Sequence, residues 1–95
     1  MTYKLKFLPA AQKEWSKLAP TIQSQFKKKL KERLENPHVP SSKLRGYDSV
    51  YKIKLRTAGY RLAYEVIDNE VVVYVLAVGK LDKDAVYKKL ASRFS

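Results

Sequence analysis

The run from Val71 to Val78 constrains the fold most, because it is apolar at every one of its eight positions. A strand with this composition has both faces covered or lies centrally in a sheet. Two segments with alternating apolar and polar residues precede it, Val50 to Arg56 and Tyr60 to Ile67. The short connections between the three segments carry turn residues, so we expect neighbouring antiparallel strands.

The rest of the chain predicts one further strand and three helices. Apolar residues alternate with lysines near the N-terminus, which indicates a strand, and elsewhere recur at three- and four-residue spacing, which indicates helices. The predicted elements are a strand at 3–7, helices at 9–18, 20–35 and 82–94 (the last with Asp82 as N-cap), and a loop at 36–49. The order β-α-α-β-β-β-α predicts a single α+β domain over residues 1–95, an antiparallel sheet packed by helices on one face.

Charge and composition restrict the function. The chain has 20 Lys and Arg against 9 Asp and Glu, a net charge of +11, which indicates a polyanionic partner such as RNA, DNA, an anionic membrane or an acidic protein. It has no cysteine and one histidine, His38, so we expect no metal or cofactor. A membrane-spanning helix needs about 20 apolar residues, whereas the longest apolar run here, Val71 to Val78, has eight. We therefore expect a cytoplasmic protein with no membrane partner.

The two alternating segments predict one sheet face rich in positive charge. In a hairpin whose paired residue numbers add to an odd value, Lys54 lies opposite Ala63, Lys52 opposite Glu65 and Arg56 opposite Arg61. The side chains expected on the core side are Tyr51, Ile53, Leu55, Leu62, Tyr64 and Val66. The cations Lys52, Lys54, Arg56 and Arg61 then share the other side, with a shallow spot at Ala63. Such a face is either a solvated surface or a phosphate-binding site. The second interpretation is supported by the repulsion between like charges at this spacing, which a bound anion would relieve.

Two other features have two interpretations each. The lysines of the second helix (Lys27, Lys28, Lys29 and Lys31) form a solvated face or dock on nucleic acid. Tyr87 lies one position off the apolar stripe of the last helix, where it flanks the core or offers its ring to a base. His38 is expected to be a surface residue, and Glu65 to pair with Lys52 rather than act as a base.

Several segments together resemble the RelE branch of the RelE/ParE toxin superfamily. They are Lys13-Glu14-Trp15, Lys27 to Leu30, Lys43 to Gly46, Tyr51 to Arg56, Gly59 to Leu62, Val66 to Asp68, Val71 to Val73, Val78 to Lys80 and Val86-Tyr87. The resemblance implies a microbial-ribonuclease-like fold and a toxin that cuts messenger RNA in the ribosomal A site. It also implies a RelB-type antitoxin as partner, with operator DNA bound only through the antitoxin.

The resemblance also implies roles for individual residues. Lys52, Lys54, Arg61 and Tyr87 match positions implicated in cleavage, and chemistry suggests Lys54 as base, Lys52 and Arg61 at the phosphate and Tyr87 stacked on a base. The cations expected to contact RNA or the ribosome are Lys27, Lys28, Lys31, Arg45, Arg56, Lys80 and Lys83. Leu81 departs from the family pattern, which commonly has an arginine there. Lys80 or Lys83 then substitutes, or the activity is weaker.

Three alternatives compete with this interpretation. A ParE-like inhibitor of DNA gyrase shares the scaffold but has no use for the Lys52, Lys54, Arg61 and Tyr87 set. Exposed aromatic residues at the centre of a sheet would indicate a non-catalytic RNA-binding module, but cations are expected at that place here. A general ribonuclease acting on free RNA is disfavoured by the absence of a His/Glu pair.

Overall fold

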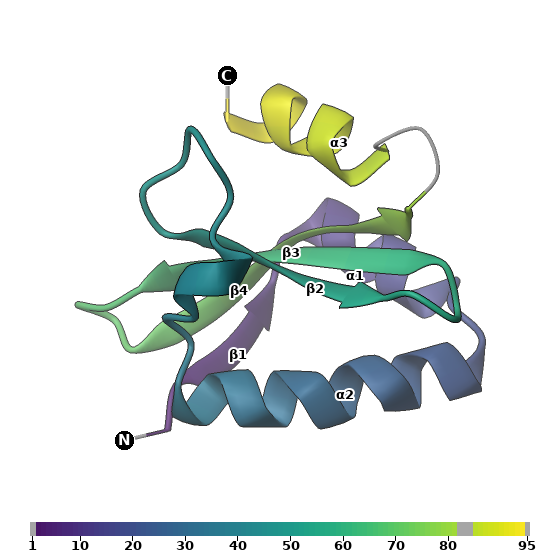
Figure 1. Cartoon of the computed structure of the whole chain (residues 1–95), viewed down its shortest axis with the longest axis horizontal. Helices are drawn as coiled ribbons and strands as arrows, with labels where there is room; N and C mark the ends of the chain where they lie inside the picture. Colours follow the sequence, from purple (N-terminus) through teal and green to yellow (C-terminus); the bar gives the residue numbers. More distant parts are fainter. Residues whose placement is uncertain (1, 82–84, 95) are drawn as a thin grey trace.

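One four-stranded sheet organises the chain, and the computed structural model describes residues 2–81 and 85–94 (Figure 1). The elements in order are β1 (Lys4–Phe7), α1 (Pro9–Ser16), α2 (Pro20–Glu35), the 3-10 helix η1 (Pro40–Ser42), β2 (Val50–Leu55), β3 (Tyr60–Ile67), β4 (Val72–Lys80) and α3 (Ala85–Phe94). The α+β class and the order of helices and strands are therefore confirmed. The predicted N-cap Asp82 lies outside the described residues.

The sheet is mixed rather than wholly antiparallel. Its strand order is β1-β4-β3-β2, and β2, β3 and β4 are antiparallel neighbours as expected. The N-terminal strand β1 lies parallel to β4, with Lys4 paired to Val72 and Phe7 to Val75. Because β1 is added beside β4, the apolar strand occupies an interior place in the sheet, as its composition predicts.

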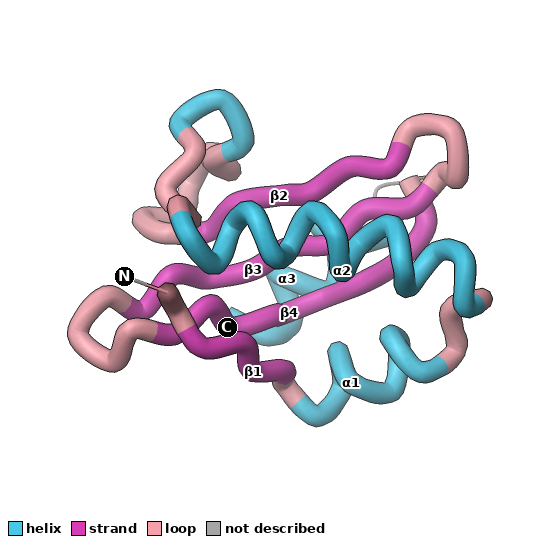
Figure 2. Tube along the Cα trace, turned by 90° about the horizontal axis from the view of Figure 1, so that it is seen from below, coloured by secondary structure: helices cyan, strands magenta, loops and turns pink. Residues whose placement is uncertain are grey.

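Helices cover both faces of the sheet, which corrects the expectation of one covered face. Figure 2 shows α2 in front of the sheet, α1 beside its β1 edge and α3 behind the sheet. The first core cluster includes Trp15, Phe26 and Leu30 from α1 and α2. A second cluster on the other face joins Val86 and Leu90 of α3 to small sheet residues, among them Ala63 and Ala77. The fully apolar run predicted a strand that has both faces covered or lies centrally in the sheet, and β4 fits both descriptions, with α3 covering its second face.

The hairpin register keeps the predicted parity but not the predicted pairs. Lys54 lies opposite Arg61, Lys52 opposite Ala63, and Glu65 opposite Val50. All six side chains expected on the core side do belong to the first core cluster. The predicted pairs were one two-residue step away, because β2 ends at Leu55 and the turn contains Arg56 to Gly59, with the Gly59 N–H donating to the Leu55 carbonyl at 2.8 Å.

Backbone conformation sets the start of β4. Val71 has φ of 57°, in the left-handed region that β-branched residues rarely adopt, so the strand begins at Val72 instead. The strand also continues past Val78 to Lys80, two residues beyond the apolar run. Within the described part of the chain, no helix has the length and apolar character that a membrane crossing needs.

Candidate active site

Three cations and one tyrosine meet on the α3 face of the sheet. Lys52 and Lys54 project from β2, and Arg61 projects from β3 directly opposite Lys54. The ring centroid of Tyr87, from α3, lies 4.4 Å from the Arg61 guanidinium carbon, a cation–π contact. We call Lys52, Lys54 and Arg61 the cationic cluster. Like charges directly opposite each other destabilise a sheet, so this arrangement favours an anion-binding role.

Burial differs sharply within the cationic cluster. Arg61 is 7% exposed, because Tyr87 and α3 cover it, whereas Lys52 is half-buried and Lys54 is exposed. The predicted open cationic face is therefore only partly open. Ala63 is fully buried in the second core cluster, so the shallow spot expected beside Lys54 does not exist. Tyr87 flanks the core, because it packs against that cluster, and it also lines a cleft.

A cleft of about 430 Å³ opens beside the cationic cluster. Its lining residues are Lys43, Leu44, Arg45, Tyr47, Lys52 and Tyr87. The segment 43–49 forms one wall, on the side of the sheet where α3 lies (Figure 1). This loop is tied to β2 by the Leu44 N–H, which donates to the Val50 carbonyl at 2.8 Å, and it turns at Gly46, which has φ of 89°. The cleft offers cations and two aromatic rings, a combination suited to a nucleotide.

The surroundings of Lys54 lower the pKa of its amine. Loss of hydration lowers the pKa of the Lys54 amine below its ordinary value, although the side chain is exposed. The positive charges of Arg56, Arg61 and Lys52 lower the same pKa further. The expectation that neighbouring cations depress this pKa is confirmed, with hydration loss as the larger cause.

Arg33 supports the cationic strand from the opposite face. Its guanidinium donates to the Lys52 carbonyl at 3.2 Å, the Tyr64 hydroxyl at 2.8 Å and the Ser42 Oγ at 3.2 Å. The contacts join the end of α2 to β2, β3 and η1. Sequence reasoning missed this role because Arg33 was one more basic residue on a basic helix. Tyr47 was also missed, since nothing in the sequence marks its loop as a cleft wall.

The other predicted RNA-binding cations within the described residues lie on different parts of the surface, and not all of them are at the cleft. Arg45 lines it, and Arg56 and Lys80 are exposed at the ends of β2 and β4. The three candidates on α2, namely Lys27, Lys28 and Lys31, are exposed on the face opposite α3 (Figure 2). Lys83 lies outside the described residues.

Two residues considered for catalysis lie elsewhere. His38 contacts the Tyr51 hydroxyl through Nδ1 at 3.0 Å and Asp68 through Nε2 at 2.8 Å. These contacts give His38 a structural role at the start of the 36–49 segment. Glu65 does not face Lys52 in the hairpin, so the expected pairing between them is wrong. Within residues 2–81 and 85–94, no group of three His, Asp or Glu side chains is placed to hold a metal ion.

Comparison with known proteins identifies the family of the chain. The model of the family described as "ParE toxin of type II toxin-antitoxin system, parDE" matches residues 5–85. The mRNA interferase toxin RelE of Escherichia coli strain K12 is 52% identical over 93 residues, which cover 98% of each chain.

Solved structures give the same result. A mutant of the E. coli toxin RelE in the free state superposes with a TM-score of 0.91 at 50% identity, covering all of both chains. The toxin in the intact E. coli RelBE toxin–antitoxin complex superposes with a TM-score of 0.80 at 56% identity, covering 82% of this chain and 95% of that one. The similarity therefore extends over the sheet, α3 and the segments that form the cleft.

Proposed function

The chain belongs to the RelE/ParE family of type II toxins, and from this premise we propose that it is a ribosome-dependent endoribonuclease that cleaves messenger RNA in the A site. The family model carries the ParE name, whereas the relative at 52% identity is named an mRNA interferase. The observation that favours the nuclease is the convergence of Lys52, Lys54, Arg61 and Tyr87 beside a nucleotide-sized cleft. A toxin that acts only by binding a protein has no need for a lysine with a lowered pKa.

The proposed reaction is cleavage without a metal. The ribose 2′-hydroxyl attacks the adjacent phosphorus in line and loses its proton, and the bond to the 5′-oxygen of the next nucleotide breaks. The products are a 2′,3′-cyclic phosphate and a 5′-hydroxyl. The enzyme has to accept one proton, stabilise added negative charge on the phosphate and return a proton to the leaving oxygen.

The residues divide these tasks by their surroundings. Lys54 is the base, since its lowered pKa raises the fraction of neutral amine at a given pH. Lys52 and Arg61 stabilise the phosphate, with Arg61 acting from beneath the surface, where low polarity strengthens its field. Tyr87 lines the cleft and stacks on a base next to the cleaved bond.

Protonation of the leaving oxygen is the step for which this chain lacks the residue that the family commonly provides. Leu81 stands where the family pattern commonly has an arginine, and its N–H donates to the Gly59 carbonyl at 2.9 Å. Lys80 is exposed next to it at the end of β4. We propose that Lys80 or Lys83 supplies the missing positive charge, at a slower rate than an arginine would.

The partners follow from the same proposal. E. coli RelE forms a complex with the antitoxin RelB, and we propose a RelB-like antitoxin for this chain, with operator DNA bound only through that antitoxin. Ribosomes and messenger RNA are the other partners, which places the protein in the cytoplasm. The exposed lysines of α2 add long-range attraction to ribosomal RNA. Residues 1–95 act as one toxin domain.

Primer extension on a defined messenger, with and without programmed ribosomes, tests the function. We expect cleavage inside the A-site codon only with ribosomes present, and its loss in Lys54→Ala. Lys13→Ala is the matched control, because it removes one exposed lysine from α1. Cleavage of free RNA would indicate a general ribonuclease. No cleavage, together with inhibition of DNA gyrase, would indicate a ParE-like toxin, and binding without either effect a non-catalytic RNA-binding module.

A further inference from the structure

The position of α3 determines where Tyr87 lies, so the contacts that hold this helix matter for the site. Four residues of α3, spaced i, i+3, i+4 and i+7, face the sheet: Val86, Lys89, Leu90 and Arg93. Val86 and Leu90 are fully buried in the second core cluster. Apolar packing is not directional, so these two residues hold the helix on the sheet without fixing its place along the strand.

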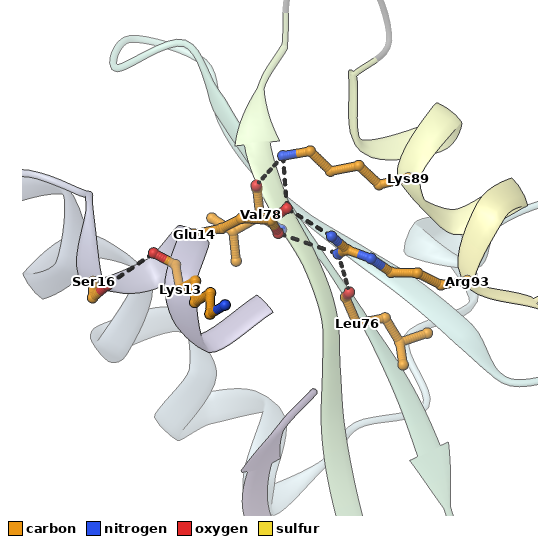
Figure 3. A network of polar contacts seen from close by, with 7 residues as sticks. All are labelled: Lys13, Glu14, Ser16, Leu76, Val78, Lys89 and Arg93. Carbon is orange, nitrogen blue, oxygen red and sulfur yellow. Dashed lines mark hydrogen bonds and ion pairs between the residues drawn. The ribbon is translucent and has the colours of Figure 1, made fainter. Parts of the chain in front are cut away.

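The two cations of this face meet one carboxylate. Glu14 of α1 accepts from Arg93 at 2.8 Å and 3.2 Å, and its Oε2 lies 3.0 Å from the Lys89 Nζ (Figure 3). The Glu14 and Arg93 side chains are each 19% exposed, and that of Lys89 is 32% exposed. Paired contacts between a guanidinium and a carboxylate are directional and strong, so they fix a geometry.

The same three side chains satisfy the outer edge of β4. The strand β1 pairs with β4 only as far as Val75, so the edge beyond that point needs other partners. The Val78 N–H donates to Glu14 Oε1 at 3.0 Å, and the Val78 carbonyl accepts from Lys89 at 2.9 Å. The Leu76 carbonyl accepts from Arg93 at 2.6 Å. The result, which we call the Glu14 network, joins α1, β4 and α3 (Figure 3).

We propose that Glu14 is a positioning residue of the active site. By holding Lys89 and Arg93 at the edge of β4, its carboxylate fixes the place of α3 and keeps Tyr87 over Arg61 at the wall of the cleft. The catalytic consequence of this inference rests on the proposed function, whereas the geometric one does not. Glu14 itself touches neither Tyr87 nor the cationic cluster, so it acts through the helix.

Two further observations connect the Glu14 network to the site. Burial opposes ionisation of Glu14, but hydrogen bonds from Arg93, the Val78 N–H and Lys89 outweigh it and lower its pKa, so the carboxylate is charged at neutral pH. Gly79, which pairs with Arg61 across the sheet, lies directly under α3. A Cβ at Gly79 would lie 3.1 Å from the Lys89 Nζ, so α3 packs closely beside Arg61 and a displacement of the helix reaches the site.

A nuclear magnetic resonance measurement on the free protein tests the geometry. The ring current of Tyr87 displaces the proton shift of the Arg61 Nε–H, and Tyr87→Leu gives the value without the ring. We expect the shift in Glu14→Gln to move toward that reference, and Glu32→Gln to leave it unchanged. Glu32 is exposed on α2, and both substitutions raise the net charge by one. An unchanged Arg61 shift in folded Glu14→Gln would overturn the proposal.

Single-turnover cleavage on programmed ribosomes tests the catalytic consequence. We expect Glu14→Gln to lower the maximal rate on the order of tenfold to a hundredfold, since small displacements of positioning groups have effects of this size. The half-saturating ribosome concentration should change less than about twofold, as docking does not use this network. In a Tyr87→Leu background, Glu14→Gln should lower the rate less than about twofold further. Equal losses in both backgrounds would indicate general destabilisation and refute positioning through Tyr87.

Glu14→Asp keeps the experiment decisive if Glu14→Gln does not fold. It preserves the charge and shortens the side chain, so we expect a folded protein with intermediate changes in both the Arg61 shift and the rate. Thermal melts followed by circular dichroism establish that each variant is folded at the assay temperature. If the unmodified protein cleaves no RNA, the proposed function fails, while the Arg61 shift still decides whether Glu14 positions Tyr87.

Discussion

Removal of the Tyr64 hydroxyl tests how much the hydrogen bonds between Tyr64, Arg33 and Pro37 contribute to the stability of the protein. Tyr64 is fully buried in the first core cluster. Its hydroxyl donates to the Pro37 carbonyl at 2.8 Å and accepts from Arg33 at 2.8 Å. Tyr64→Phe deletes both hydrogen bonds while keeping the ring, so it isolates their contribution to stability.

The partners that remain determine the size of the effect. The Pro37 carbonyl still accepts from the Val39 N–H at 3.1 Å, and Arg33 still donates to the Lys52 carbonyl at 3.2 Å. Neither group is left without a partner, so the cost is the net loss of two hydrogen bonds at about 0.5–1.5 kcal/mol each. We expect about 1.5 kcal/mol in total, because each partner keeps another hydrogen bond. In a domain of this size each kcal/mol lowers the melting temperature by about 4–8 °C, which predicts a decrease of roughly 6–12 °C.

Thermal melts followed by circular dichroism measure this decrease, with Tyr3→Phe as the matched control. The Tyr3 hydroxyl donates to Asp68 at an exposed site, so its loss should lower the melting temperature by less than about 4 °C. Ribosome-dependent cleavage by Tyr64→Phe, assayed well below its melting temperature, should stay within about twofold of the unmodified protein, since Tyr64 lies on the other face from the cleft. A decrease smaller than that of Tyr3→Phe would refute the reasoning.

Three further predictions concern the site. Arg56→Gln removes a positive charge that lowers the Lys54 pKa, so that pKa should rise and the acidic limb of the pH–rate profile should move to higher pH; an unmoved limb would contradict Lys54 as base. Leu81→Arg should raise the single-turnover rate on the order of tenfold or more at saturating ribosomes. No gain would show that another residue already stabilises or protonates the leaving oxygen. Simultaneous Lys27→Gln, Lys28→Gln and Lys31→Gln should weaken ribosome binding and its salt dependence while leaving the maximal rate unchanged, which a titration at several salt concentrations measures.

The hairpin shows what alternation can and cannot predict. A period of two assigns each side chain to a face, which is why the core side of β2 and β3 was predicted correctly. A slip of two residues preserves every assignment, so the pattern cannot distinguish Lys54 opposite Ala63 from Lys54 opposite Arg61. The turn determines the register, through the positive φ of Gly59 and the hydrogen bond from the Gly59 N–H to the Leu55 carbonyl. The direct opposition of Lys54 and Arg61 therefore needed the structure.

The last helix shows a different limit. Its apolar stripe predicted a packed helix but not which sheet face it covers, and Tyr87 off that stripe had two interpretations. The apolar run in β4 indicated a strand that is covered on both faces or lies centrally, and small residues such as Ala63 and Ala77 make room for α3. The Glu14 network was not predictable, because its members lie far apart in the sequence and meet only where β1 ends beside β4.

The different burial of Lys54 and Arg61 explains how two opposed cations can take separate roles. Arg61 is buried beneath the ring of Tyr87, whereas Lys54 opposite it is exposed. Loss of hydration and nearby positive charges lower the pKa of an amine, and both lower the pKa of Lys54. The positive charge of Arg61 lowers the Lys54 pKa, and in the proposed reaction the same charge attracts the phosphate. In the proposed reaction, exchanging the two residues would place the guanidinium at the exposed position, where the base is needed, and the amine beneath the Tyr87 ring.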